Sequence, residues 1–106
     1  MLSTIDRKVA IELKKRLVPL VSLLDFRIYG SRARGDASPE SDLDIFIEVE
    51  TLSKDQRWKI FELASEVGYE MDRVISTFVA TREQLSKGPL AANPILNKIE
   101  QEGISL

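Results

Sequence analysis

The sequence of 106 residues contains no cysteine and no histidine. Without cysteine the chain can form no disulfide, no thiol nucleophile and no thiolate zinc site. Without histidine it lacks the commonest general base and the commonest zinc ligand. Any catalysis must therefore use carboxylates, hydroxyl groups, lysine or arginine, together with metals that prefer oxygen ligands.

Long apolar runs and a strong net charge are also absent. No apolar stretch approaches the roughly 18 residues that a membrane span needs, and residues 1–7 are too polar for the core of a signal peptide. With 15 basic and 17 acidic residues the formal net charge is −2, so no basic field attracts nucleic acid. We therefore expect a cytoplasmic protein that binds neither membranes nor DNA. Its length predicts a single domain over residues 1–106.

Apolar periodicity and capping residues predict alternating helices and strands. Ser3 and Asp6 resemble a capping box that opens a helix over 4–18, with apolar residues at every fourth position from Ile5. Further helices are predicted over residues 53–68, after Thr81, and from Asn93–Pro94 to Gly103, and strands over 24–29, 42–50 and 71–79. This order predicts an α/β (α+β) fold with a small mixed sheet of three to four strands backed by helices.

The helix predicted over 53–68 carries an apolar stripe and one tryptophan outside it. The stripe consists of Ile60, Phe61, Ala64 and Val67. By helical geometry Trp58 lies off this stripe, where it either covers the edge of the core or anchors a partner protein.

A glycine-serine turn with two arginines follows the first predicted strand. Gly30 would let a phosphate approach the backbone, and Ser31 adds a hydroxyl donor. Arg32 and Arg34 could donate bidentate hydrogen bonds to phosphate oxygens. The same residues could equally be a helix cap followed by surface arginines. The segment lacks the lysine of a P-loop and the three-glycine spacing of dinucleotide-binding proteins.

Three aspartates could form a metal site. Asp42 and Asp44 stand at i and i+2 where a strand begins, so their side chains point to the same side. They suit either a solvated strand start or a clamp for two divalent ions about 3.5–4 Å apart. Such a clamp usually needs a third carboxylate from a neighbouring strand. Asp72 is the only acid inside the third predicted strand, although an ion pair with Arg73 would also account for it.

Residues 30–44 resemble the signature of the polymerase-β-like nucleotidyltransferase superfamily, and specifically of its minimal nucleotidyltransferases (MNT-type). The shared pattern is Gly-Ser, an Arg-Ala-Arg-Gly extension, and Ser-Asp-x-Asp opening a hydrophobic strand. Residues 69–72 and 93–106 resemble the third-acid strand and the closing helix of that family. Arg73 departs from the pattern, because the family usually has an apolar residue there. The resemblance covers nearly the full length and implies the nucleotidyltransferase fold.

The resemblance implies metal-dependent transfer of NMP, most simply AMP, from ATP or another NTP to a hydroxyl group. Two Mg²⁺ ions, or Mn²⁺ in their place, would be the cofactors. The implied residues are Gly30, Ser31, Arg32 and Arg34 for the nucleotide phosphates, and Asp42, Asp44 and Asp72 for the metal ions and catalysis.

The resemblance also implies a protein partner. Stand-alone MNT proteins resemble antitoxins paired with HEPN-type toxins, in which a tyrosine hydroxyl of the helical partner is the acceptor. The chain has no room for the acceptor-binding domain of larger relatives, which suits a substrate supplied by another chain. Two alternatives stay open: a catalytically silent module that neutralises its partner by contact, and transfer to a small-molecule hydroxyl. A homo-oligomer is also compatible with so small a chain.

Overall fold

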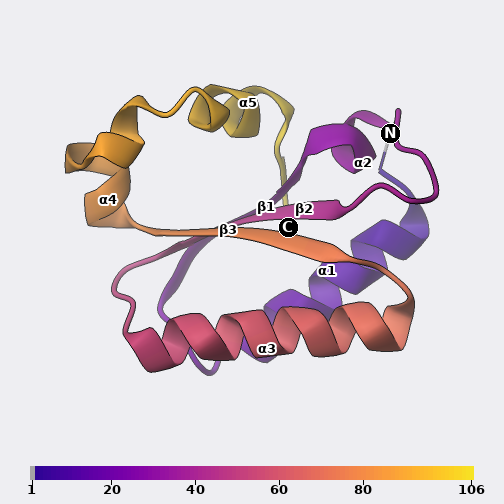
Figure 1. Cartoon of the computed structure of the whole chain (residues 1–106), viewed down its shortest axis with the longest axis horizontal. Helices are drawn as coiled ribbons and strands as arrows, with labels where there is room; N and C mark the ends of the chain where they lie inside the picture. Colours follow the sequence, from indigo (N-terminus) through magenta and orange to yellow (C-terminus); the bar gives the residue numbers. More distant parts are fainter. Residues whose placement is uncertain (1) are drawn as a thin grey trace.

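The structure is a computed structural model that describes residues 2–106, and it places one mixed sheet between two layers of helices (Figure 1). The strands lie in the order β3-β2-β1-β4, with β1 antiparallel to both β2 and β4 and with β2 parallel to β3. Their bounds are β1 Leu23–Tyr29, β2 Leu43–Val49, β3 Ile75–Thr81 and β4 Ile104–Ser105. The helices are α1 Thr4–Leu17, α2 Gly30–Arg34, α3 Lys54–Met71, α4 Arg82–Lys87, the 3-10 turn η1 Pro89–Ala92 and α5 Ile95–Glu102. The predicted α/β architecture is confirmed.

The main core lies between the sheet and the layer formed by α1 and α3. Strand β2 alternates as predicted, and its fully buried residues on this face are Leu43, Ile45, Ile47 and Val49. Figure 1 shows α2, α4 and α5 on the opposite side of the sheet. There a smaller cluster forms, in which Tyr29 of β1 and Phe46 of β2 pack with Ile99 of α5. Asp44 lies on this second face, because it alternates with the buried core residues of β2.

Among the helices that the structure describes, α1, α3 and α4 begin with a side-chain cap that the sequence indicates. The capping boxes at Ser53 and Thr81 both form, with the glutamine three residues later completing each one. Ser3 accepts a hydrogen bond from the Asp6 N–H, but the Asp6 carboxylate does not complete a box, because it pairs with arginines instead. Among residues 2–106 no helix combines the length and the apolar character that crossing a membrane requires.

Two apolar residues that the pattern places in the core are exposed. Ile5 is 56% exposed and Phe61 is 57% exposed. A strict repeat of four residues drifts around a helix by about 40° per step, which takes Ile5 away from the sheet. Phe61 follows Ile60 by about 100°, so that Leu63 takes its place in the buried stripe of α3.

The prediction of a strand over 71–79 is wrong at its start. Helix α3 continues to Met71, and β3 begins only at Ile75. Gly68 does not end the helix but is buried inside it, where an added Cβ would meet the Arg73 carbonyl oxygen. Asp72 is the C-cap of α3 in the left-handed conformation, with φ 57° and ψ 50°. It therefore lies at the end of a helix and not in a strand.

Candidate active site

The Gly30–Ser31 turn meets the Asp44 carboxylate where β1 ends and β2 begins. Tyr29 and Asp44 are register partners, so the chain leaves β1 directly beside Asp44. Gly30 has a φ of 76°, in the left-handed region that favours glycine. A Cβ at this position would also collide with Asp44 Oδ2. Glycine therefore allows both the turn and the close approach of the backbone to this carboxylate.

A cavity of about 510 Å³ opens at this junction. Its lining residues are Tyr29, Gly30, Ser31, Arg34, Asp44, Pro94, Ile95, Lys98 and Glu102. Tyr29, Lys98 and Glu102 are not predicted from the sequence. Lys98 and Glu102 stand at i and i+4 and so share one face of α5, but only the packing of α5 against α2 brings them to the motif.

The electrostatics of the cavity centre on Asp44. Burial raises the pKa of Asp44, the charge of Asp42 raises it further, and Arg34 opposes both effects. Asp42 is exposed just before β2. The two carboxylates thus stay close despite their repulsion, which a divalent cation would relieve. The donor set fits Mg²⁺, which binds one or two carboxylates together with phosphate oxygens and water.

Tyr29 forms one wall of the cavity. Burial raises the pKa of the Tyr29 phenol, and the charge of Asp44 raises it further. The phenol therefore stays protonated at neutral pH and can donate a hydrogen bond.

The structure does not bring Asp72 to Asp42 and Asp44. The register partner of Asp44 on β3 is Ser76, which shares the same face of the sheet. Within residues 2–106, no three side chains of the aspartate, glutamate, histidine or cysteine type come together as metal ligands. The predicted three-carboxylate cluster is therefore not formed, because the third acid ends α3 instead of lying on β3.

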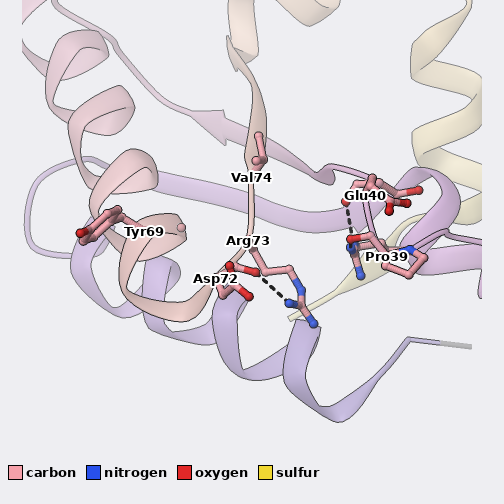
Figure 2. A pocket seen from close by; sticks show the side chains of 9 residues that line it. Pro39, Glu40, Tyr69, Asp72, Arg73 and Val74 are labelled. Carbon is pink, nitrogen blue, oxygen red and sulfur yellow. Dashed lines mark hydrogen bonds between the residues drawn. The ribbon is translucent and has the colours of Figure 1, made fainter.

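Asp72 lines a different and larger cavity of about 610 Å³. Figure 2 shows it at the α3–β3 turn beside Arg73, across from Pro39 and Glu40. Arg73 donates to the Asp72 carbonyl oxygen at 2.8 Å, so this contact involves the backbone of Asp72 and leaves its carboxylate out. The smaller cavity is the candidate active site, because it contains both the glycine turn and Asp44.

Arg32 is largely enclosed by contacts within the protein and lines the larger cavity, not the smaller one. Its side chain is only 9% exposed, and its Nη1 lies 3.2 Å from Asp6 Oδ2. Nε donates to the Ser41 carbonyl at 2.9 Å and Nη2 to the Pro39 carbonyl at 3.2 Å. The guanidinium thus holds the loop that leads into Asp42, and this placement does not support its predicted contact with phosphate.

The carboxylate that Arg32 contacts also accepts a hydrogen bond from Arg73, at 2.8 Å. Burial by itself would raise the pKa of Asp6, but hydrogen bonds from Arg73 and Arg32 outweigh it and hold the pKa below its usual value. The ionised aspartate therefore joins three segments that are distant in the sequence.

Arg34 lies on the wall of the smaller cavity. Its side chain is 42% exposed. Nη1 lies 3.0 Å from Glu102 Oε2, and Nε lies 3.1 Å from Asp36 Oδ2. A nucleotide phosphate would compete with these two carboxylates for the guanidinium.

Comparison with known proteins places this geometry in a family. The profile of the nucleotidyltransferase domain matches residues 10–104. The chain belongs to this family. The matched range includes the Gly30–Ser31 turn, Asp42, Asp44 and α5.

Solved structures share the fold of this nucleotidyltransferase domain. One chain, from a toxin–antitoxin complex with AMP-PNP, is 21% identical and has a TM-score of 0.62, over 92% of this chain and 69% of that one. A chain from a mutant MntA–HpeT toxin–antitoxin complex is 20% identical with a TM-score of 0.63, over 94% and 70%. A chain from the tri-AMPylated HEPN toxin of Shewanella oneidensis in complex with its MNT antitoxin is 20% identical with a TM-score of 0.56, over 95% and 67%. Among curated proteins none matches this chain.

Proposed function

We propose that this nucleotidyltransferase domain transfers NMP from an NTP to a hydroxyl group of a HEPN-type partner protein and so acts as an antitoxin. The observation that carries this proposal is the close approach of the Gly30 backbone to the Asp44 carboxylate, which leaves no room for a Cβ, at the wall of one cavity. It joins a phosphate-binding turn to a pair of metal-binding carboxylates. In the reaction, the acceptor hydroxyl loses its proton to solvent, its oxygen bonds to the α-phosphorus, and the bond from that phosphorus to pyrophosphate breaks, so that pyrophosphate leaves.

The residues of the cavity bind and position the nucleotide. The first turn of α2 has no side-chain cap, so its N–H groups and the Ser31 hydroxyl are suited to phosphate oxygens. Arg34 and Lys98, which also line the cavity, offset the negative charge of the triphosphate. Such positioning and charge neutralisation are the main contributions of a protein to phosphoryl-type transfer.

Asp42 and Asp44 would hold Mg²⁺, with Mn²⁺ as an alternative. When bound, the ion neutralises charge on the phosphates and makes the acceptor hydroxyl more acidic. Two carboxylates suffice for one such ion when phosphate oxygens and water complete its coordination. A second ion would depend more strongly on the substrate for its ligands.

The choice of AMP and of a HEPN partner rests on the structural neighbours and on the motif. The neighbours include a toxin–antitoxin complex with an ATP analogue and a tri-AMPylated HEPN toxin bound to its MNT antitoxin. The active-site cavity lies at the surface between α2 and α5, where a side chain of another protein can reach it. A tyrosine hydroxyl, as implied by the sequence resemblance, is the proposed acceptor.

One observation favours a second function, that of a silent binding module. Ser76, not an acid, stands beside Asp44 on the neighbouring strand. Loss of a third carboxylate weakens metal binding, so that the domain could neutralise its partner by contact alone. The two functions differ in whether the partner becomes covalently modified.

The deciding experiment incubates the purified chain and the product of its neighbouring gene with Mg²⁺ and ATP labelled at the α-phosphate. We expect label on the partner, and none when the ATP is labelled at the γ-phosphate. Asp42→Asn and Asp44→Asn should each lower labelling by at least about a hundredfold, because each removes a charge that the metal and the phosphates require.

Asp55→Asn is the matched control, because Asp55 lies exposed in the first turn of α3, on the other side of the sheet. It should label the partner like the unmodified chain. A stable complex without any label would establish the silent binding module, and undiminished labelling by both active-site variants would disprove the assigned site.

A further inference from the structure

The outer face of α3 exposes two aromatic side chains in contact with each other. Trp58 is 63% exposed and Phe61 is 57% exposed. Their ring centroids lie 5.6 Å apart in a tilted arrangement. Trp58 therefore does not cover the edge of the core, and exposed pairs of large apolar side chains are typical of interaction sites.

Two cations complete this surface. Lys54, Arg57, Trp58 and Phe61 line a groove of about 340 Å³, which we call the α3 groove. Neither Lys54 nor Arg57 forms an ion pair with another of the residues 2–106, whereas Arg16, Arg32 and Arg73 do. The groove surface itself is almost entirely apolar, and the cations of Lys54 and Arg57 stand at its rim, with the exposed Asp55 between them in the sequence.

We propose that the α3 groove docks an acidic amphipathic helix of a protein partner. An apolar side chain of that helix would pack against the rings of Trp58 and Phe61, while its carboxylates would accept hydrogen bonds from Lys54 and Arg57. Tryptophan and arginine dominate the energetics of protein interfaces, and an apolar helix face in a groove is a common mode of recognition.

An apolar groove with two cations at its rim favours this occupant over two others. A second copy of this chain would bring Lys54 and Arg57 of both copies into one isologous contact, where they repel each other. Nucleic acid would need a wider basic field than two cations on an acidic chain supply. A helix with carboxylates beside its apolar residues satisfies both the rings and the cations.

The docking surface and the active site lie on different sides of the molecule. Helix α3 covers one face of the sheet, and α2 and α5, which line the active-site cavity, lie on the other (Figure 1). A partner could therefore be held at the α3 groove while the nucleotide cavity stays open. The proposal does not depend on nucleotidyl transfer.

Trp58 is the only tryptophan of the chain and reports directly on its own surface. The test adds a helical peptide of about 18 residues with leucine at i, i+3, i+4 and i+7 and glutamate on both flanks. We expect a saturable blue shift of tryptophan emission, because docking removes the indole from water. A peptide with lysine in place of each glutamate should give no shift.

Two variants that each replace a cation of α3 by glutamate test the role of charge. Arg57→Glu should weaken binding of the glutamate peptide by at least about tenfold and allow binding of the lysine peptide. Lys59→Glu makes the same change in net charge one residue beyond Trp58, outside the groove, and should leave the shift unchanged. Circular dichroism would establish that both exposed variants fold.

The proposal fails if both peptides bind equally or if neither shifts the emission. It also fails if the emission shifts with protein concentration alone, which would indicate a second copy, or with single-stranded RNA in place of the glutamate peptide. None of these outcomes affects the labelling experiment, so the docking surface and the proposed activity are tested separately.

Discussion

Arg32 and Arg34 belong to the same short motif, yet they have opposite environments. Arg32 points into a buried ion cluster with Asp6 and holds the carbonyl of Ser41. Arg34 points to the cavity that contains Asp44. Their spacing in a helix accounts for this, because residues two apart differ by about 200° in direction. At the scale of single residues, one arginine joins parts of the fold and the other lines the candidate site.

We expect Arg32→Ala to lower the free energy of unfolding by about 1–3 kcal/mol, because it leaves two carbonyls and a buried carboxylate with fewer donors. Nucleotide affinity of the folded fraction should fall less than in Arg34→Ala, because Arg32 acts only through the loop that leads into Asp42. Arg34→Ala should change stability by about 1 kcal/mol or less, as is usual for exposed ion pairs, but should weaken ATP binding. Urea unfolding and calorimetric titration with ATP measure both quantities. Loss of ATP binding in Arg32→Ala without loss of stability would restore the phosphate role predicted from the sequence.

The pairing of β2 with β3 determines which side chains neighbour the Asp44 carboxylate. The parallel register sets Ser76 beside Asp44, and the antiparallel register of β1 sets Tyr29 on its other side. Asp72 stays outside this row, because the left-handed C-cap of α3 lies three residues before β3 begins. At the scale of elements, the length of one helix thus determines the number of carboxylates in the site.

Ser76→Asp should create the third carboxylate that the register allows. Without metal we expect a lower melting temperature, because three acids would then repel each other on one face. Mg²⁺ should restore the melting temperature and bind about tenfold more tightly than in the unmodified chain, since carboxylate charge raises metal affinity. Ser76→Asn is the neutral control of similar shape.

Asp72→Asn should leave Mg²⁺ affinity unchanged, and a loss of affinity in this variant would show that Asp72 belongs to the metal site.

The Asp6 cluster acts at the scale of the whole molecule. It ties α1 to Arg32 of α2 and to Arg73 of the α3–β3 turn. Through the hydrogen bond from Arg32 to the Ser41 carbonyl it also reaches the loop that places Asp42. The cluster therefore connects the packing of the helices to the geometry of the active site.

The Asp6 cluster should make the free energy of unfolding depend on pH in the acid range. The pKa of Asp6 is lower in the folded protein than its usual value of about 3.9. The ionised Asp6 carboxylate therefore contributes fully to the free energy of unfolding when the pH is above its usual pKa. This contribution is lost as the pH falls through the lower pKa of the folded state. Asp6→Asn should cost about 3 kcal/mol at neutral pH, because Arg32 and Arg73 lose their buried partner. Urea unfolding over a series of pH values should show the two proteins converging in acid, and parallel profiles would rule out this linkage.

Much of the local structure follows from the sequence because its causes are local. The alternation of β2 predicts its two faces, and the caps at Ser53 and Thr81 predict two helix starts. The end of α3 does not follow in this way. Gly68 reads as a helix terminator, but it is retained inside α3 because only glycine fits against the Arg73 carbonyl. That contact is formed by tertiary packing, so the local residue pattern does not predict it.

The sequence by itself determined the glycine turn and the Asp42–Asp44 pair, because a short loop and a period of two residues suffice to bring them together. Only the tertiary structure decided which distant groups join them. In the folded chain Arg32 pairs with Asp6, and Glu102 pairs with Arg34. Ser76, and not Asp72, lies beside Asp44. The physical reason is that strand register and helix packing depend on contacts between segments far apart in the chain, which no local pattern specifies.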